Sequence, residues 1–468
     1  MVCLAVAAVT VAVFTAGLGR IDLLDPDEGR HGEIAREMLA NSHFVTPRLQ
    51  GQLYDDKPVL FHWLAAASIK TFGPGAFAVR LPSALAGVWT VFITAWWAWR
   101  CWGTRTALLT AVGLATTLSF VAIGRYAVVD MLFTSALCTA LAWLGVCLVE
   151  DFKGRSLLPY YAATAVAALV KGPVAFVLAG MVALGAMAIA RADGSRGVLG
   201  RMRPFAGSAL ALAIVLPWYL AAWIDEPAYI EAFLWHHNLE RYAMGGGAGF
   251  THGQPWYYFA VALPLGLLPW FPLIAAGVVG RLGKTVRGRT DLYAVVWATA
   301  VLAFFLPSKT KLLTYVLPAF PPLLALGGAW LATQTQPRQV WQKAWRGFSL
   351  LWVALLACTG IAVFAWLLTT TGPTPTTAVA LTPVAIFLAA ALLHSSVGWH
   401  RGAVAAAVAS LSLMAVAYGP GAHALNQIRS LKAAADIVKA ELPPQGLLLA
   451  YGCAPHSLAF YAGRTARR

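Results

Sequence analysis

The chain has 468 residues, of which 59% are hydrophobic and only 11% are charged, and its mean hydropathy is +0.69. Soluble globular proteins average about 25% charged residues, so a water-soluble enzyme of this size is excluded because too few charges cover its surface. The long, unbroken apolar runs also exclude a disordered chain and an outer-membrane β-barrel. The composition predicts an all-α polytopic membrane protein.

Apolar runs of about 20 residues can cross a bilayer as helices, and their number predicts about 13 transmembrane helices. Lys171 separates two short runs, so we expect a broken or re-entrant segment there. The expected spans are, in chain order, Val2–Leu18, Val79–Trp99, Thr106–Gly124, Ala127–Val149, Leu157–Val170, Val174–Ala190, Gly207–Trp223, Phe259–Val279, Leu292–Pro307, Leu312–Ala332, Ser349–Leu368, Ala378–Leu393 and Ala403–Gly419.

The net charge of +15 belongs mainly to short connections between these spans. If the N-terminus is cytoplasmic, the basic connections near Arg100, Lys153, Arg201 and Arg287 are cytoplasmic too, as the positive-inside rule requires. The basic character therefore follows from membrane topology and does not indicate a nucleic-acid partner.

Residues 1–420 are expected to form the membrane domain, with two long exterior connections at about 20–78 and 225–258. Long connections outside a helix bundle are usually functional. Residues 421–468 lie on the same side and have the pattern of a helix, a short strand and a second helix. They predict a short C-terminal α/β segment that stops early.

The densest polar stretch, Asp25–Glu33, begins just after the first expected span. Asp25 and Pro26 suit the N-cap and start of a helix, with Asp27 and Glu28 in its first turn. The helical spacing of the apolar residues that follow predicts an amphipathic helix at the membrane surface. Ordinary capping is the alternative, but such charge density in so apolar a chain favours a functional site.

A second polar cluster, Tyr54-Asp55-Asp56-Lys57-Pro58, lies in the same exterior connection. Paired carboxylates beside a lysine suit a divalent metal, and the lysine suits a phosphate. A turn with a local salt bridge is the alternative.

In the second connection, His236 and His237 are a weak metal signal and Arg241 suits a phosphate, while nearby glycines favour a mobile lid.

Five further charges border or interrupt apolar runs on the expected outer side, namely Arg125, Asp130, Lys171, Lys309 and Lys311. A charge at membrane depth is costly and indicates a functional site by default. Together with Arg30 and the clusters above, these residues predict one exterior cavity at the membrane boundary. Its cations would hold a lipid phosphate while a carboxylate faces the head group.

The most distinctive motifs of the chain are Asp27-Glu28, Glu33–Met38, Val45–Leu49, Tyr54–Pro58 and Arg80–Ala84. With these motifs the sequence resembles the bacterial aminoarabinose transferases, which are related to the protein O-mannosyltransferases and belong to the GT-C glycosyltransferases. A looser resemblance extends through Arg125–Asp130, Lys171-Gly172, His236–Arg241 and Ser308–Pro318.

This resemblance implies a multi-spanning inner-membrane enzyme whose active site faces the periplasm. The donor would be a sugar on undecaprenyl phosphate, and transfer would invert the anomeric centre. In the founding members the sugar is 4-amino-4-deoxy-L-arabinose and the acceptor is a phosphate of lipid A. The tail is shorter than the family's soluble domain, which weakens the transfer of acceptor identity to this chain.

The resemblance also implies residue roles. Asp27, with Glu28 beside it, would be the catalytic carboxylate. Asp56, which stands where the family usually has Glu, and His236 would hold a divalent ion such as Zn²⁺, Mg²⁺ or Mn²⁺. The donor phosphate would be bound by Lys57, Arg241, Tyr54, Tyr315 and Lys171.

Three alternatives stay open. A protein O-mannosyltransferase or hexosyltransferase would share the fold but use another acceptor. A flippase for lipid-linked sugars predicts internal repeats and polar groups near the midplane. A structural membrane protein predicts that the polar clusters are merely solvated.

Overall fold

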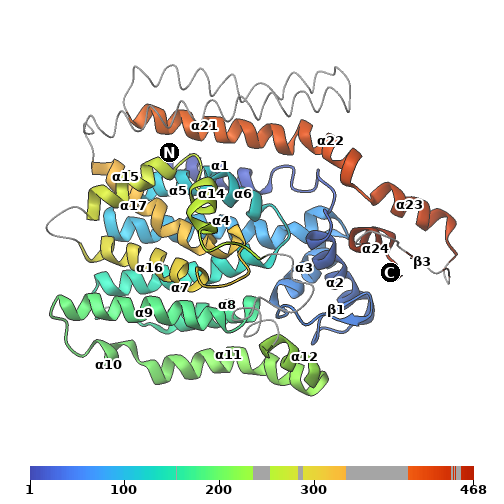
Figure 1. Ribbon diagram of the computed structural model, residues 1–468, viewed down its shortest axis with the longest axis horizontal. Coiled ribbons are helices and arrows are strands. Elements are labelled where there is room, and N and C mark those ends of the chain that lie inside the picture. Colours follow the sequence, from blue (N-terminus) through green and yellow to red (C-terminus); the bar gives the residue numbers. More distant parts are fainter. Residues whose placement is uncertain are drawn as a thin grey trace.

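The computed structural model describes residues 1–153, 155–235, 253–282, 288–333, 399–443, 446, 448–449 and 455–467. These residues are almost entirely helical, and the long helices lie side by side in a bundle (Figure 1). The helices of the bundle are α1 (Val2–Thr15), α4 (Ala76–Trp102), α5 (Thr104–Thr116), α6 (Leu118–Gly124), α7 (Val129–Val149), α8 (Leu158–Lys171), α9 (Val174–Ala192), α10 (Val198–Met202), α11 (Pro204–Asp225), α14 (Tyr258–Gly266), α15 (Phe271–Leu282), α16 (Arg289–Phe305), η2 (Leu313–Ala319), α17 (Phe320–Thr333) and α21 (Trp399–Tyr418).

Each expected span within the described residues coincides with a helix or a helix pair, but fewer of them are long enough to cross a membrane than the sequence predicted. Five are long and apolar enough, and the number reaches 8 if each of three bent pairs counts as one span. The five are Ala76–Trp102, Val129–Val149, Val174–Ala192, Val198–Asp225 and Leu313–Thr333. Two expected spans, Ser349–Leu368 and Ala378–Leu393, lie outside the described residues.

The break expected at Lys171 is present. Helix α8 ends at Lys171, Gly172 adopts a φ of +83°, and α9 begins at Val174. The 14 residues of α8 rise only about 21 Å at 1.5 Å per residue, which is short of a hydrocarbon core of about 30 Å. Helix α8 is thus too short to cross the bilayer by itself, and Lys171 lies at its end.

The basic connections meet at one end of the bundle. Arg100 pairs with Glu150 at 2.5 Å, and Asp151 pairs with Arg201 at 3.4 Å and with Arg289 at 3.3 Å. These contacts join the α4–α5, α7–α8 and α9–α11 connections to the start of α16. The sequence placed these connections on a common side of the membrane, and the structure brings them together.

Small residues let the helices of the bundle approach closely. Phe14 of α1 is fully buried between α4 and α6. A Cβ added at either Gly87 or Gly124 would lie 2.4 Å from its ring. These two glycines therefore fix the depth at which α1 packs.

The segments that the sequence places outside the membrane gather at the other end of the bundle (Figure 1). The connection between α1 and α4 forms α2 (Asp27–Asn41), the antiparallel strands β1 (Arg48–Leu49) and β2 (Gln52–Leu53), and α3 (Leu60–Phe72). The short helix α12 (Pro227–Glu231) follows α11. The tail forms α22 (Pro420–Arg429), α23 (Lys432–Glu441), α24 (His456–Ala462) and a parallel strand pair, β3 (Leu448–Leu449) with β4 (Ala466–Arg467). The helix–strand–helix order expected for the tail is thus confirmed.

Candidate active site

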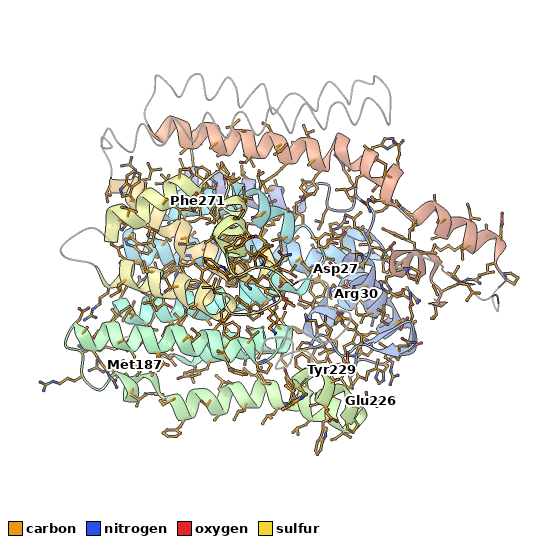
Figure 2. All side chains as sticks on the ribbon, viewed as in Figure 1. Asp27, Arg30, Met187, Glu226, Tyr229 and Phe271 are labelled. Carbon is orange, nitrogen blue, oxygen red and sulfur yellow. The ribbon has the colours of Figure 1, made fainter. Side chains whose placement is uncertain are left out.

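The first turn of α2 exposes a carboxylate toward solvent. Asp27 keeps 48% of its side chain exposed and pairs with Arg30 at 3.6 Å. Figure 2 shows both residues at the end of the bundle that also carries Tyr229, while Met187 lies toward the opposite end. Asp27 is therefore accessible to a ligand at this end of the bundle.

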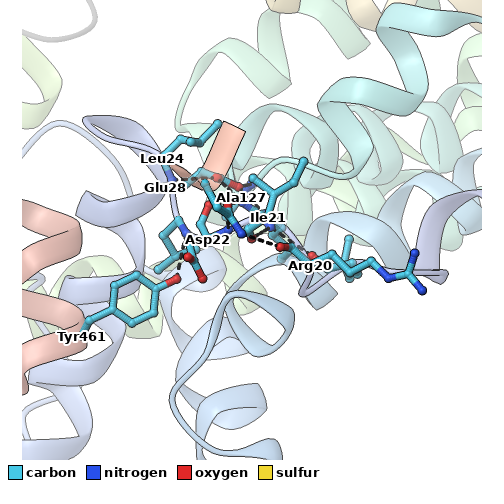
Figure 3. A network of polar contacts seen from close by, with 11 residues as sticks. Arg20, Ile21, Asp22, Leu24, Glu28, Ala127 and Tyr461 are labelled. Carbon is cyan, nitrogen blue, oxygen red and sulfur yellow. Dashed lines mark hydrogen bonds and ion pairs between the residues drawn. The ribbon is translucent and has the colours of Figure 1, made fainter. Parts of the chain in front are cut away.

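Glu28, the next residue, is fully buried. Its two carboxylate oxygens accept hydrogen bonds from Arg80 at 2.7 and 2.6 Å. They also accept from the backbone N–H groups of Leu24, at 3.1 Å, and Ala127, at 2.9 Å (Figure 3). These contacts favour a structural role for Glu28 over the catalytic role expected from the sequence.

The expected N-cap role of Asp25 is wrong. Helix α2 begins at Asp27 with Pro26 as the N-cap residue, and no side chain caps it. The Asp25 carboxylate instead accepts two hydrogen bonds from Ser457 of α24, one from its backbone N–H at 2.9 Å and one from its hydroxyl. The Asp25 carboxylate, which was expected to cap α2, thus binds the C-terminal tail instead.

The second polar cluster forms a continuous polar chain with the first. Arg30 lies within electrostatic reach of Tyr54, and the Tyr54 hydroxyl donates to Asp56 at 3.3 Å. Lys57 Nζ donates to the Asp56 carboxylate at 2.7 Å. Burial and the neighbouring Asp56 raise the pKa of Tyr54, so it stays a neutral phenol that can donate a hydrogen bond.

A tight hairpin explains why Tyr54 faces α2. Gln50 and Gly51, between β1 and β2, both adopt positive φ, at +56° and +78°. Their N–H groups donate to Glu37 of α2 at 2.7 and 3.1 Å, which fixes the turn against that helix. From the other side, the Tyr229 hydroxyl donates to the carbonyl of Lys57 at 2.7 Å.

A buried histidine pair joins α2 to α3 behind this chain. His31 Nδ1 lies 3.0 Å from His62 Nε2, and the ring of His31 stands edge-on to that of Tyr54 at 6.5 Å. Burial lowers the pKa of both histidines, that of His62 to about 3, so the pair is neutral at physiological pH. Sequence reasoning missed this pair, because nothing in either segment indicates that the two residues meet.

A second cluster brings together three of the residues expected to line the cavity. Lys171 forms an ion pair with Asp130, at the start of α7. Its Nζ lies 4.7 Å from the centroid of the Tyr315 ring and 5.2 Å from that of Phe133. The side chains of Lys171 and Asp130 are 12% and 14% exposed, so this cation is largely desolvated.

Arg125 has a structural environment rather than the expected cavity position. It is buried, donates to the carbonyls of Val13 and Ala16 at 2.6 and 2.7 Å, and stacks over the Tyr418 ring at 4.0 Å. It therefore anchors the end of α1. Lys311 is likewise buried and donates to the carbonyls of Gln254, at 3.3 Å, and Ser308, whereas Lys309 is exposed.

The expected metal site cannot be assembled from the part of the chain that the structure describes. His236 and Arg241 lie outside the described residues. Within those residues no group of three or more His, Cys, Asp or Glu side chains could hold a metal ion. Because Asp56 already pairs with Lys57 and Tyr54, its surroundings fit an ion-pair network, and we derive no step through a metal.

The fold and these clusters define an integral membrane protein with a polar site at one end of a helix bundle. Residues 56–221 match the family described as dolichyl-phosphate-mannose-protein mannosyltransferase. The chain is 32% identical over 317 residues to the undecaprenyl phosphate-alpha-4-amino-4-deoxy-L-arabinose arabinosyl transferase of Edwardsiella ictaluri, a match that covers 66% of this chain and 55% of the relative. It is 31% identical over 353 residues to the enzyme of that name from Aeromonas salmonicida, with 72% and 62% covered. The chain thus spans less than two thirds of the length of these relatives.

Solved structures share the fold. ArnT from Cupriavidus metallidurans bound to undecaprenyl phosphate superposes with a TM-score of 0.80 at 22% identity, over 99% of this chain and 85% of that one. The oligosaccharyltransferase of Archaeoglobus fulgidus gives a TM-score of 0.52 at 12% identity, over 100% and 63%. The resemblance expected from the sequence is confirmed: this chain is similar to the aminoarabinose transferases and shares the fold of ArnT.

Proposed function

We propose that this chain is a membrane glycosyltransferase that takes a sugar from undecaprenyl phosphate. The observation that carries the proposal is the polar chain from the exposed Asp27 through Arg30 and Tyr54 to Lys57. It provides a carboxylate for an acceptor and cations for a phosphate within one site. The names of the relatives at about 30% identity support the same donor.

In this mechanism the bond between the sugar C1 and the donor phosphate oxygen breaks, and its electron pair leaves with undecaprenyl phosphate. Lys57 and Arg30 stabilise the negative charge that develops on the phosphate, as preorganised cations do in other transfers. Lys57 would exchange its contact with Asp56 for one with the phosphate. The acceptor oxygen forms the new bond to C1 from the opposite face, which inverts the configuration.

The role of Asp27 depends on the acceptor. A hydroxyl acceptor must lose a proton as it attacks, and Asp27 would take that proton as a general base. A lipid A phosphate is already ionised near neutral pH, and Asp27 would then orient the acceptor or the sugar. We infer aminoarabinose as the sugar and lipid A as the acceptor because the relatives carry that name.

We also propose an inner-membrane location with the site on the periplasmic face. The ion-paired basic end would face the cytoplasm, as the positive-inside rule predicts. The Lys171–Asp130–Tyr315 cluster would also line the donor site, where Lys171 would be a third cation beside Lys57 and Arg30. A divalent ion at Asp56 and His236 stays a prediction from the sequence. Loss of activity with a chelator and its recovery on adding Zn²⁺, Mg²⁺ or Mn²⁺ would support it.

Mass spectrometry of lipid A, other glycans and secreted proteins from cells with and without this chain tests the proposal. Loss of a pentosamine from lipid A on deletion supports the proposed sugar and acceptor. Loss of a hexose from secreted proteins would redirect the assignment to a protein mannosyltransferase, the alternative that the match over residues 56–221 favours. Unchanged lipids, glycans and proteins would contradict both.

A further inference from the structure

The connection between α1 and α2 is held along its length by the C-terminal tail. The Tyr461 hydroxyl accepts from the N–H of Leu23 at 2.8 Å (Figure 3). The side-chain amide of Asn426 accepts from the N–H of Asp22 at 2.9 Å and donates to the carbonyl of Arg20 at 2.8 Å. The tail therefore supplies backbone partners that this irregular segment cannot supply itself.

Two glycines of α2, Gly29 and Gly32, form the surface on which α24 packs, and this surface is called the seat of α24. A Cβ added at Gly29 would lie 2.5 Å from the backbone nitrogen of Ser457, and one added at Gly32 would lie 3.3 Å from the Phe460 ring. The first distance is too short for any Cβ, and the second is tight. Gly29 thus allows the backbone of α24 to approach α2 within one turn of Asp27.

Ser457 connects this seat to the candidate catalytic turn. It is fully buried and donates two hydrogen bonds to the carboxylate of Asp25, which lies two residues before Asp27. On the other side of the same turn, Arg80 holds Glu28 and donates to the carbonyls of Ile21 and Asp22. The first turn of α2 is thus held between the membrane bundle and the tail.

We propose that Ser457 is a positioning residue: seated on Gly29 and Gly32 and bonded to Asp25, it fixes the first turn of α2 and so the direction in which Asp27 presents its carboxylate. The contacts of Ser457, Tyr461 and the two glycines show how α24 packs on α2. The effect of this packing on catalysis rests on the proposed function. A misplacement of about 1 Å can cost about a hundredfold in rate, so a contact outside the reacting groups can control turnover.

Hydrogen exchange of the full chain in detergent tests the docking without any substrate. Ser457→Ala removes the hydroxyl donor to Asp25, and Gly29→Ala places a methyl group against both partners of that contact, Oδ1 of Asp25 and the backbone nitrogen of Ser457. The matched control is Gly180→Ala on α9, where an added Cβ meets no atom within 4 Å. We expect faster exchange of the amides of residues 28–34 in both test variants and wild-type exchange in the control. Wild-type exchange in all three would overturn the proposal.

Kinetics test the positioning. We expect Ser457→Ala to lower kcat about tenfold, since one hydrogen bond to a charged group is lost, with the donor KM unchanged, and Ser457→Thr to restore kcat. In an Asp27→Asn background Ser457→Ala should have no further effect. Multiplicative effects of the two substitutions, or a raised donor KM alone, would contradict action through Asp27. A wild-type chain that releases no undecaprenyl phosphate would refute the proposed function, and the exchange result would still decide the docking.

Discussion

Glu28 and Arg80 form a bidentate ion pair with distances of 2.7 and 2.6 Å, and their side chains are 0% and 4% exposed. Asp27, the adjacent residue of the same turn, is 48% exposed. The two neighbouring carboxylates thus have different roles: Glu28 holds α2 to α4, and Asp27 is available to a ligand.

Glu28→Gln should destabilise the protein without a direct effect on chemistry. Removing one partner of a buried ion pair leaves the other charge uncompensated and costs about 3–5 kcal/mol. We expect a lower Tm and a lower yield of monodisperse protein in detergent. Glu226→Gln is the control, because its pair with Arg48 at 3.5 Å is 37% exposed on both sides and such pairs contribute about 0–1 kcal/mol. Equal Tm values for the two variants would contradict the structural role of Glu28.

Asp27→Asn should show the opposite pattern. Its exposed carboxylate contributes little to packing, so Tm should stay at the wild-type value while transfer falls about 100-fold or more with a hydroxyl acceptor. Asp436→Asn, an exposed carboxylate on α23, is the control and should transfer normally. Full transfer to a hydroxyl acceptor by the Asp27 variant would rule out the base role.

Lys57→Ala should weaken donor use. Loss of a hydrogen bond to a charged phosphate costs about 1.5–3 kcal/mol, which corresponds to a donor KM raised roughly tenfold to a hundredfold. Lys153→Ala is the control, because Lys153 is 66% exposed and pairs with Asp151 at the basic end of the bundle. An unchanged donor KM in the Lys57 variant would refute the phosphate clamp.

The His31–His62 pair should make stability depend on pH. Burial lowers both pKa values in the folded state, that of His62 to about 3, so below about pH 6.5 the unfolded chain binds more protons than the folded one. Stability is therefore fully present above pH 6.5 and falls with acidification by about 1.4 kcal/mol per pH unit for each histidine. Tm measured from pH 8 to pH 5 should fall less in a His31→Phe/His62→Phe double variant. An equal fall would show that the pair does not control acid stability.

The sequence identified the polar groups of the site better than their partners. The sequence shows two polar clusters, one with Asp27 and one with Tyr54 and Lys57, and predicts that they face one cavity; the structure brings them near each other at one end of the bundle. The catalytic role expected for Glu28 follows from its place beside Asp27, whereas the ion pair that makes it structural joins it to Arg80, 52 residues away on another helix. A lone arginine in an apolar run requires a carboxylate or carbonyl partner, but the sequence does not show which residue supplies it.

The cavity positions predicted for isolated charges in apolar runs are only partly correct, again because their partners lie far away in the sequence. Lys171, Asp130 and Tyr315 do form one cluster, whereas Arg125 and Lys311 are satisfied by backbone carbonyls. Sequence shows that a buried cation needs partners, but only the packing of α1 against α6 shows that those of Arg125 are main-chain oxygens. Within the described residues the expected spans likewise coincide with helices or helix pairs, while their bends, such as the 67° bend between α5 and α6, depend on tertiary contacts.

We propose that this chain transfers a sugar from undecaprenyl phosphate at the site that contains Asp27 and Lys57. The most direct measurement uses the purified chain with aminoarabinosyl undecaprenyl phosphate and lipid A, and follows both products by mass spectrometry. We predict equimolar appearance of free undecaprenyl phosphate and pentosamine-modified lipid A, with turnover strongly reduced in Lys57→Ala. No release of undecaprenyl phosphate by the folded wild-type chain would contradict the account.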